Sequence, residues 1–391
     1  MEHNLQDIPL IIGVLSGVLL IAPFVAQTLR FPLAVVEIIF GSIIGYMGIL
    51  HGNTYIPLLA KTGFLFLMFL AGMEVNLKNF LTIKASLFKR AIGYFFILYS
   101  LSALIVWFFH YSIIYLVAFP IVSLGMIMAL IKEIGKEEPW IKLTLIIGIF
   151  GELISITALT LLSGVLEYGL TMSFLRAIGI LILFLITSGL IYKFATTIFW
   201  WYPNLRKIIM PENDNSEKDI RLSMAFFFAM IGLMISLGLD MVLGAFIAGI
   251  FITTFFKHKV DLPHKLSSLG FGFLVPIFFI YVGSTLNLEA ITSPDIMFLA
   301  LQILGIMLSI RIASSMVYLQ KLGLKNTLML AMGDSMPLTF LLAIATIGKE
   351  TNSISSNEYY ALVMAGMVGS IIMMSTIKLI IMLDKKRALN L

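Results

Sequence analysis

Long apolar runs separated by short polar breaks follow one another along the whole chain. A helix needs about 20 mostly apolar residues to cross the hydrocarbon core of a bilayer. By that length the pattern predicts about thirteen membrane-spanning helices, at 8–29, 32–50, 55–75, 88–109, 111–131, 141–163, 171–198, 220–239, 240–256, 267–286, 295–320, 325–348 and 357–383. The least distinct boundary is the join between residues 239 and 240. We therefore expect an all-α polytopic membrane protein.

Composition agrees with a chain that is solvated by lipid. Hydrophobic residues make up 60% of the 391 residues and charged residues only 12%, whereas a soluble domain carries about 25% charged residues. Cysteine is absent, which excludes disulfides, thiolate metal ligands and a cysteine nucleophile. The net charge is +5, but the basic residues stand in short groups between apolar runs. This placement favours a lipid bilayer as the partner and argues against nucleic acid.

The distribution of basic residues predicts the orientation. With thirteen spans, the two ends of the chain lie on opposite sides of the membrane. Placing the C-terminus in the cytoplasm puts 22 of the 26 lysines and arginines on the cytoplasmic side. Three lie outside (Lys61, Arg176 and Lys349), and Arg311 lies within a span. Because cytoplasmic loops are rich in Lys and Arg, we expect the N-terminus outside and the C-terminus inside, in the cell (inner) membrane.

The longest polar stretch, 202–219, divides the chain nearly in half. We expect a single transmembrane domain over 1–391, made of a first repeat at 1–163, a linker helix and cytoplasmic loop at 164–219, and an inverted second repeat at 220–391. No stretch of folding size follows the last predicted span, so no soluble regulatory domain is expected.

Four charged residues fall inside predicted spans: Glu37, Glu152, Arg311 and Asp334. A charge near the bilayer centre costs about 2.5–3.5 kcal/mol on insertion scales, so each is a candidate functional residue. One arginine and two acids at similar depth can neutralise each other, and a purely structural ion pair is the alternative to a transport role. Glu37 lies about one turn from the cytoplasmic end of its span and can extend toward the surface. We interpret it as a gate or a structural acid.

Two prolines interrupt predicted spans, Pro120 in the fifth and Pro337 in the twelfth. If the seventh span is a linker, each proline lies in the fifth helix of a six-helix half, and the two halves have inverted topology. Broken helices at matching places in inverted repeats mark a midplane ion or substrate site in secondary transporters. Hydroxyl oxygens beside these breaks come from Ser123, Ser335 and Thr339. The pattern predicts two inverted six-helix repeats with crossed broken helices.

Four segments with a distinctive pattern lie in order across almost the whole chain. They are Leu33–Gly45 (LAVVEIIFGSIIG), Phe69–Glu74 (FLAGME), Leu243–Gly249 (LGAFIAG) and Val275–Gly283 (VPIFFIYVG). Together they resemble sodium/proton exchangers of the second monovalent cation:proton antiporter family. The resemblance implies a core domain that carries the crossed helices, a dimerisation domain beside it, and a homodimer. Gly13 and Gly17 form a small-xxx-small face on the first span, which we place near the dimer interface.

The resemblance also implies roles for individual residues. Glu152 falls where the family has its ion-binding aspartate, so Na+ or K+ would bind there. Arg311 falls where members keep a basic residue that pairs with core carboxylates, and Ser123 falls in the first broken helix. This chain departs from the family pattern in having Gly151 before the acid, in having glutamate as the acid, and in lacking a threonine in the first break, where Leu124-Gly125-Met126 follows Ser123.

Three functions are compatible with these residues. The first is an antiporter that exchanges a monovalent cation for H+ by alternating access. The second is a symporter of organic anions on a similar scaffold, with Arg311 as the substrate anchor. The third is a channel or a membrane sensor that does not transport, which the altered acid motif favours. The sequence has no phosphate loop, catalytic triad or metal-ligand cluster, so we expect a carrier that is not an enzyme and needs no cofactor.

The basic residue at position 311 affects how many protons are exchanged per cation. Arginine keeps its proton in proteins, whereas a lysine at this position could release one. Asp334 is, with Glu152 and Ser123, a candidate ion- or proton-binding residue. If Asp334 is the permanent salt partner of Arg311 and Glu152 alone titrates, one proton is exchanged per cation and the cycle is electroneutral. If Asp334 is instead a second proton site, two protons move and the cycle is electrogenic. We favour the paired role, because an arginine between two midplane acids needs at least one of them ionised.

Overall fold

A computed structural model describes residues 8–29, 31–49, 55–74, 85–123, 138–169, 217–237, 241–256, 261–286 and 293–389, with isolated residues in the intervening segments. The described part is helical and contains no strand. Eight of its helices are long and apolar enough to cross a membrane. Large apolar side chains on these helices are exposed, including Leu20 (68%), Phe96 (72%) and Trp107 (76%). Such faces fit a chain surrounded by lipid.

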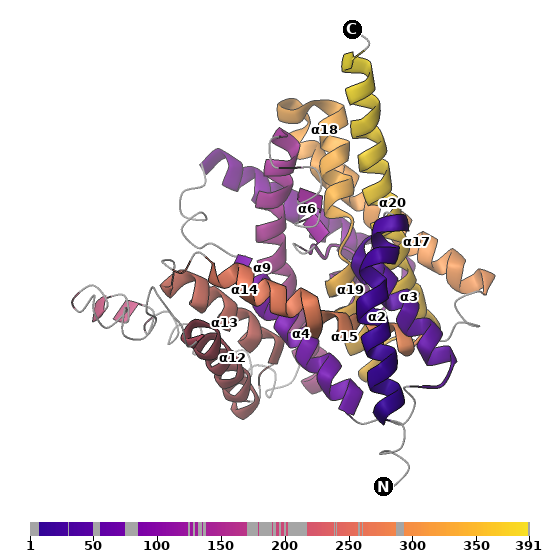
Figure 1. Cartoon of the computed structure of the whole chain (residues 1–391). Helices are drawn as coiled ribbons and strands as arrows, with labels where there is room; N and C mark the ends of the chain where they lie inside the picture. Colours follow the sequence, from indigo (N-terminus) through magenta and orange to yellow (C-terminus); the bar gives the residue numbers. More distant parts are fainter. Residues whose placement is uncertain are drawn as a thin grey trace. The chain divides into compact units, whose positions relative to one another are not determined.

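The helices fall at the predicted positions (Figure 1). Their bounds are α2 Ile8–Leu29, α3 Leu33–Tyr46, α4 Tyr55–Glu74, α6 Ala85–Phe109, α7 Ile113–Ala118, α9 Pro139–Tyr168, α12 Lys218–Ser236, α13 Met241–Phe255, α14 Leu262–Leu269, η1 Gly270–Leu274, α15 Val275–Ser284, α17 Pro294–Ser315, η2 Met316–Tyr318, α18 Leu319–Asp334, α19 Leu338–Glu350 and α20 Ser356–Leu389. The uncertain join at 239/240 separates two helices, α12 and α13. The predicted span at 171–198 lies largely outside the described residues, so the count of thirteen stays a prediction.

The segment Pro294–Asp334 runs through α17, η2 and α18 as one continuous stretch of helix. Gly323 divides it, because its backbone has φ 73° and ψ 166°, which is not helical. A positive φ of this kind suits glycine, which has no Cβ to clash with the backbone. The chain therefore changes direction near the predicted boundary between the eleventh and twelfth spans.

The chain forms two compact units. The first contains Met1–His51, Ile83–Leu162 and Val282–Leu391, and the second contains Gly52–Thr82 and Ser163–Tyr281. Each unit takes residues from both halves of the sequence. The expected sequence repeats at 1–163 and 220–391 stay a prediction.

In the first unit, α17 packs against α6, α18 and α20, and α19 packs against α7 and α20. Helix α3 lies directly against the end of α15. A Cβ added at Gly283 would stand 2.0 Å from the carbonyl oxygen of Ile38. Glycine therefore permits the two backbones to touch, as it does at other close helix crossings.

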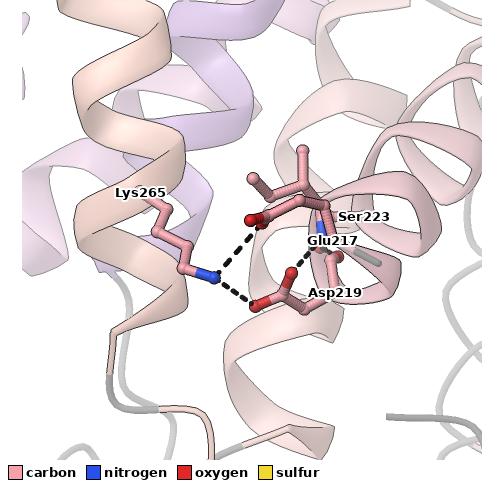
Figure 2. Close-up of polar contacts among 5 residues, drawn as sticks. Glu217, Asp219, Ser223 and Lys265 are labelled. Atoms are coloured by element: carbon pink, nitrogen blue, oxygen red, sulfur yellow. Dashed lines mark hydrogen bonds and ion pairs between the residues drawn. The ribbon is translucent and has the colours of Figure 1, made fainter. Parts of the chain in front are cut away.

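In the second unit, α4 packs along α13, and α12 packs on both α13 and α14. The rings of Phe66, Phe69 and Phe227 form a cluster with centroids 5.3–5.7 Å apart. Figure 2 shows how the start of α12 is tied to α14: Lys265 Nζ lies 3.2 Å from Asp219 Oδ2 and 3.3 Å from Glu217 Oε2. Because the Asp219 side chain is almost fully buried, Lys265 supplies a charge partner that this acid needs.

Candidate functional site

Two helix breaks form the centre of the first unit. Helix α7 ends at Ala118, Pro120 follows, and residues 121–123 are not helical. Helix α18 ends at Asp334, and α19 begins at Leu338, directly after Pro337. Proline has no N–H to donate and its ring clashes with the preceding turn, so both interruptions occur where the sequence predicts them.

The two breaks touch each other through their side chains. Ser123 Oγ and Thr339 Oγ1 are 2.7 Å apart, and both residues are buried. One residue comes from the first break and the other from the first turn of α19. This hydrogen bond joins segments that are 216 positions apart in the sequence. The expected meeting of the broken helices is therefore present.

Arg311 holds both breaks by their backbone. Its side chain is fully buried on α17. Nε donates to the carbonyl oxygen of Asp334 at 2.9 Å, and Nη1 donates to the carbonyl of Phe119 at 2.8 Å. Nη1 also donates to the carbonyl of Met307 at 2.9 Å, and Nη2 donates to the carbonyl of Ile121. The last carbonyls of a helix lack helical partners and carry partial negative charge. One guanidinium thus stabilises the ends of α7 and α18 together.

The side-chain ion pair that we expected between Arg311 and Asp334 is not formed. Between these two described residues, the contact runs from Nε to the main-chain oxygen of Asp334, and the carboxylate is not within ion-pair distance. The physical reason is competition for donors. Arginine has five N–H groups, and four of its hydrogen bonds go to backbone carbonyls.

Helix α9 passes along both breaks. The backbone N–H of Val122, in the first break, donates to Ser155 Oγ of α9 at 3.0 Å. Nearer the start of α9, Thr144 lies against the last turn of α18. A Cβ added at Gly333 would stand 3.1 Å from the methyl carbon of Thr144. Glu152 lies three residues before Ser155 on the same helix and is 1% exposed. A buried carboxylate is therefore located on the helix that lines the interrupted segments.

Gly151 explains one departure from the family pattern. A Cβ added at this position would stand 2.6 Å from Cβ of Val122, closer than van der Waals contact allows. Glycine lets α9 approach the first break, so a larger residue would force the two apart. The sequence suggested a weakened acid motif, whereas the structure gives Gly151 a packing role.

We expect Gly151→Ala to lower stability, because overpacking a filled core costs about 1–3 kcal/mol. Cation-driven transport should fall as well, since the break and Glu152 would shift apart. Gly305→Ala on α17 is the matched control, because nothing lies within 4 Å of its added Cβ. Thermal unfolding of the two purified variants in detergent checks this. Equal unfolding temperatures would refute the packing role.

Asp334 makes a different contact from the one that the sequence suggested. Its Oδ2 accepts a hydrogen bond from the hydroxyl of Tyr94 on α6, at 3.0 Å. Its Oδ1 is buried without a hydrogen-bond partner among the described residues, and so are the hydroxyls of Tyr99 and Tyr318. We did not single out these tyrosines from the sequence. Tyr94 and Tyr99 carry a signal, because they lie inside an apolar run and away from the interfacial belt where tyrosine is usual. Tyr318 carries none, because it lies two residues from the end of the predicted span 295–320.

The remaining sequence candidates are not all part of this cluster. Glu37 is buried on α3, at 4% exposure, and no hydrogen bond joins it to the described residues of the breaks. The breaks bring Pro120, Ser123, Arg311, Asp334 and Pro337 into one region. Glu152 borders that region through its neighbours on α9.

Known proteins resemble this chain in sequence and in fold. The family model described as "Sodium/hydrogen exchanger, transmembrane" matches residues 16–383. The chain is 27% identical to YjbQ of Bacillus subtilis over 367 residues, covering 88% of this chain and 58% of that protein. It is 24% identical to the Na(+)/H(+) antiporter of Enterococcus hirae over 373 residues, covering 92% and 95%.

A solved structure shares the fold. The sodium proton antiporter MjNhaP1 of Methanocaldococcus jannaschii superposes with a TM-score of 0.65 and 14% sequence identity, over 95% of this chain and 96% of that one. This likeness, together with the long apolar helices of the described residues, supports a helical multi-pass membrane fold. With a family match that extends over nearly its whole length, the chain belongs to the sodium/hydrogen exchanger family.

Proposed function

We propose that this chain is a secondary active transporter that exchanges a monovalent cation, Na+ or K+, for H+ by alternating access. The observation that carries the proposal is the burial of Glu152 on α9, the helix that contacts both broken helices. A carboxylate at such a place binds either a proton or a cation, because each neutralises a charge that is costly in an apolar interior. Competition for one carboxylate couples the two ions.

The surrounding groups fit this role. The breaks contribute hydroxyl and carbonyl oxygens, with Ser123 at the point where they meet. Arg311 secures the broken ends through four carbonyls, so the oxygens have a fixed arrangement. The proposal assigns ion movement to these residues and involves no chemical reaction and no bound cofactor.

Reconstituted protein tests the proposal. Vesicles that contain a pH-sensitive dye should show proton movement when NaCl or KCl is added outside, and none when an impermeant organic cation salt is added. Proton movement that requires an organic anion would instead support a symporter anchored at Arg311. Proton movement that needs no added ion would indicate a channel. Either of these results would overturn the proposal.

We also propose a homodimer in the cell (inner) membrane, with the N-terminus outside and the C-terminus in the cytoplasm. The face of α2 around Gly13 and Gly17 supports the dimer, because nothing lies within 4 Å of a Cβ added at either residue. An open small-residue face permits close approach of another helix. This assignment rests on the small-residue spacing together with the open space around it.

Gly13→Leu combined with Gly17→Leu should shift the protein from dimer toward monomer in mild detergent. The new side chains have room within the protomer, so the change would act on contacts with a second copy. Mass photometry or size exclusion with light scattering measures the two populations. Gly93→Ala, at another open position, is the control. An unchanged dimer fraction would remove this face from the interface.

A further inference from the structure

A buried polar cluster lies beside the second break, where α18 ends at Asp334. Helices α6 and α17 pack together, η2 contacts both, and α18 packs on α17 and η2. From these elements come the side chains of Tyr94, Arg311, Tyr318 and Asp334, each at most 1% exposed. The cluster is distinct from Glu152, and the exchange proposed above does not require its tyrosines.

The hydrogen bonds in this cluster are incomplete in a particular way. Tyr94 donates to Asp334 Oδ2, while Oδ1 has no partner. The hydroxyl of Tyr318 is also unpartnered, and η2, the element that carries Tyr318, packs against α18. The rings of Tyr94 and Tyr318 are 6.3 Å apart between centroids. Buried polar atoms are rarely left in this state, so each unpaired atom needs an explanation.

The charged groups around Asp334 limit the possible reasons for its unpaired oxygen. An ionised carboxylate needs donors on both oxygens when it is removed from water. The nearest cation, Arg311, gives its hydrogen bonds to backbone carbonyls, including the main-chain oxygen of Asp334 itself. Arg90 donates to the carbonyl of Val317 at 3.4 Å, and the Lys325–Asp384 pair lies nine residues from Asp334 along α18, about 14 Å at helical rise. The described cations thus leave the free oxygen without a charged donor.

A metal cation would fit poorly in this cluster. It would lie beside a buried guanidinium and would find few oxygens without partners. The described residues also contain no group of three or more acidic, histidine or cysteine side chains that could hold a metal ion. A proton on Asp334 removes the buried negative charge and turns one carboxyl oxygen into a donor. The hydroxyl oxygen of Tyr318 can accept from that donor, either directly or through one bridging water.

We propose that Asp334 is a second proton-binding carboxyl of this protein, present as a neutral acid in the resting state, with Tyr94 bonded to one oxygen and Tyr318 facing the other. This assignment rests on the proposed cation/proton exchange in one respect: it adds a second proton site to the one at Glu152. It also replaces the salt partnership with Arg311 that the sequence suggested. Because a neutral Asp334 needs no cationic partner, Arg311 can donate its hydrogen bonds to backbone carbonyls, including those of the two breaks.

Infrared spectroscopy of the full chain in lipid nanodiscs, with carbon-13-labelled aspartate, tests the assignment. At neutral pH the wild type should show the carbonyl-stretch band of a buried protonated aspartic acid, and Asp334→Asn should lose it. Tyr318→Phe and Tyr94→Phe should shift the band, because each removes a hydroxyl from one side of the carboxyl. Tyr99→Phe is the matched control and should leave the band in place, because Tyr99 also has a buried, unpaired hydroxyl but makes no hydrogen bond to Asp334.

The assignment would be overturned if the difference spectrum between wild type and Asp334→Asn contained only the bands of ionised carboxylates. A band that Tyr318→Phe and Tyr94→Phe leave unmoved would overturn it too, and this comparison holds even if Asp334→Asn fails to assemble. Absence of ion exchange in wild-type vesicles would refute the proposed function instead. The spectrum reads the carboxyl itself, so the two failures are distinguishable.

Discussion

Replacing Glu152 with glutamine should reduce cation-driven proton flux to the level of empty vesicles while the protein still inserts and folds. Glutamine keeps the volume of the side chain and its hydrogen-bonding capacity, but it cannot exchange a proton for a cation. Glu152 is 1% exposed, so an amide there removes a buried charge and leaves packing intact. Flux measured with a pH-sensitive dye in vesicles, at matched protein content, gives the comparison.

Glu152→Asp is the informative control for that variant. It keeps the charge, shortens the side chain by one methylene, and restores the acid that the family resemblance leads us to expect. We expect measurable exchange with an altered apparent affinity for the cation. Near-normal flux in Glu152→Gln would contradict the assignment and would move the exchanging role to Asp334.

Replacing Arg311 with leucine should cause the largest loss of stability among the substitutions considered. The change leaves the carbonyls of Phe119, Ile121 and Asp334 buried without their charged donor. An unsatisfied buried polar group costs about 1–3 kcal/mol, so three such groups predict a loss of several kcal/mol. The two breaks should then separate, and transport should be lost because the broken helices no longer contact each other.

Arg311→Lys tests whether the positive charge alone is enough or whether the shape of the guanidinium is needed. Lysine keeps the positive charge but offers a single ammonium group instead of a planar fork, so it cannot reach carbonyls on both breaks at once. We expect an unfolding temperature between those of wild type and Arg311→Leu. Ser309→Leu, at an exposed position of the same helix, controls for the effect of leucine on α17. Wild-type thermal stability of Arg311→Leu would refute the bridging role.

The helices and their interruptions could be predicted from the sequence because both depend on local chemistry. Apolar length determines where a helix can cross a bilayer, and Pro120 and Pro337 mark the breaks because proline disrupts a helix wherever it occurs. The hydroxyl contact between Ser123 and Thr339 was partly foreseeable, since both lie beside a predicted break. The burial of Glu152 also follows from its position in the middle of an apolar run.

The partners of Arg311 could not be predicted in the same way. An arginine and two acids at similar depth suggest an ion pair, but carbonyls at helix ends are acceptors that no side-chain pattern reveals. Which carbonyls become free depends on where two distant segments meet. The packing role of Gly151 has the same origin, because it depends on the approach of Val122 from the first break. Tertiary contacts decide these details.

Uptake of radiolabelled sodium into vesicles, driven by a proton gradient that is acidic inside, tests most directly whether this chain couples the two ions. The account predicts uptake above the external concentration in wild-type vesicles, collapse of that uptake when a protonophore dissipates the gradient, and no gradient-driven uptake in Glu152→Gln. Labelled rubidium in place of sodium would show the same behaviour if K+ is the preferred cation. Entry of either label at a rate that ignores the proton gradient, or equal uptake by wild type and Glu152→Gln, would contradict exchange at Glu152.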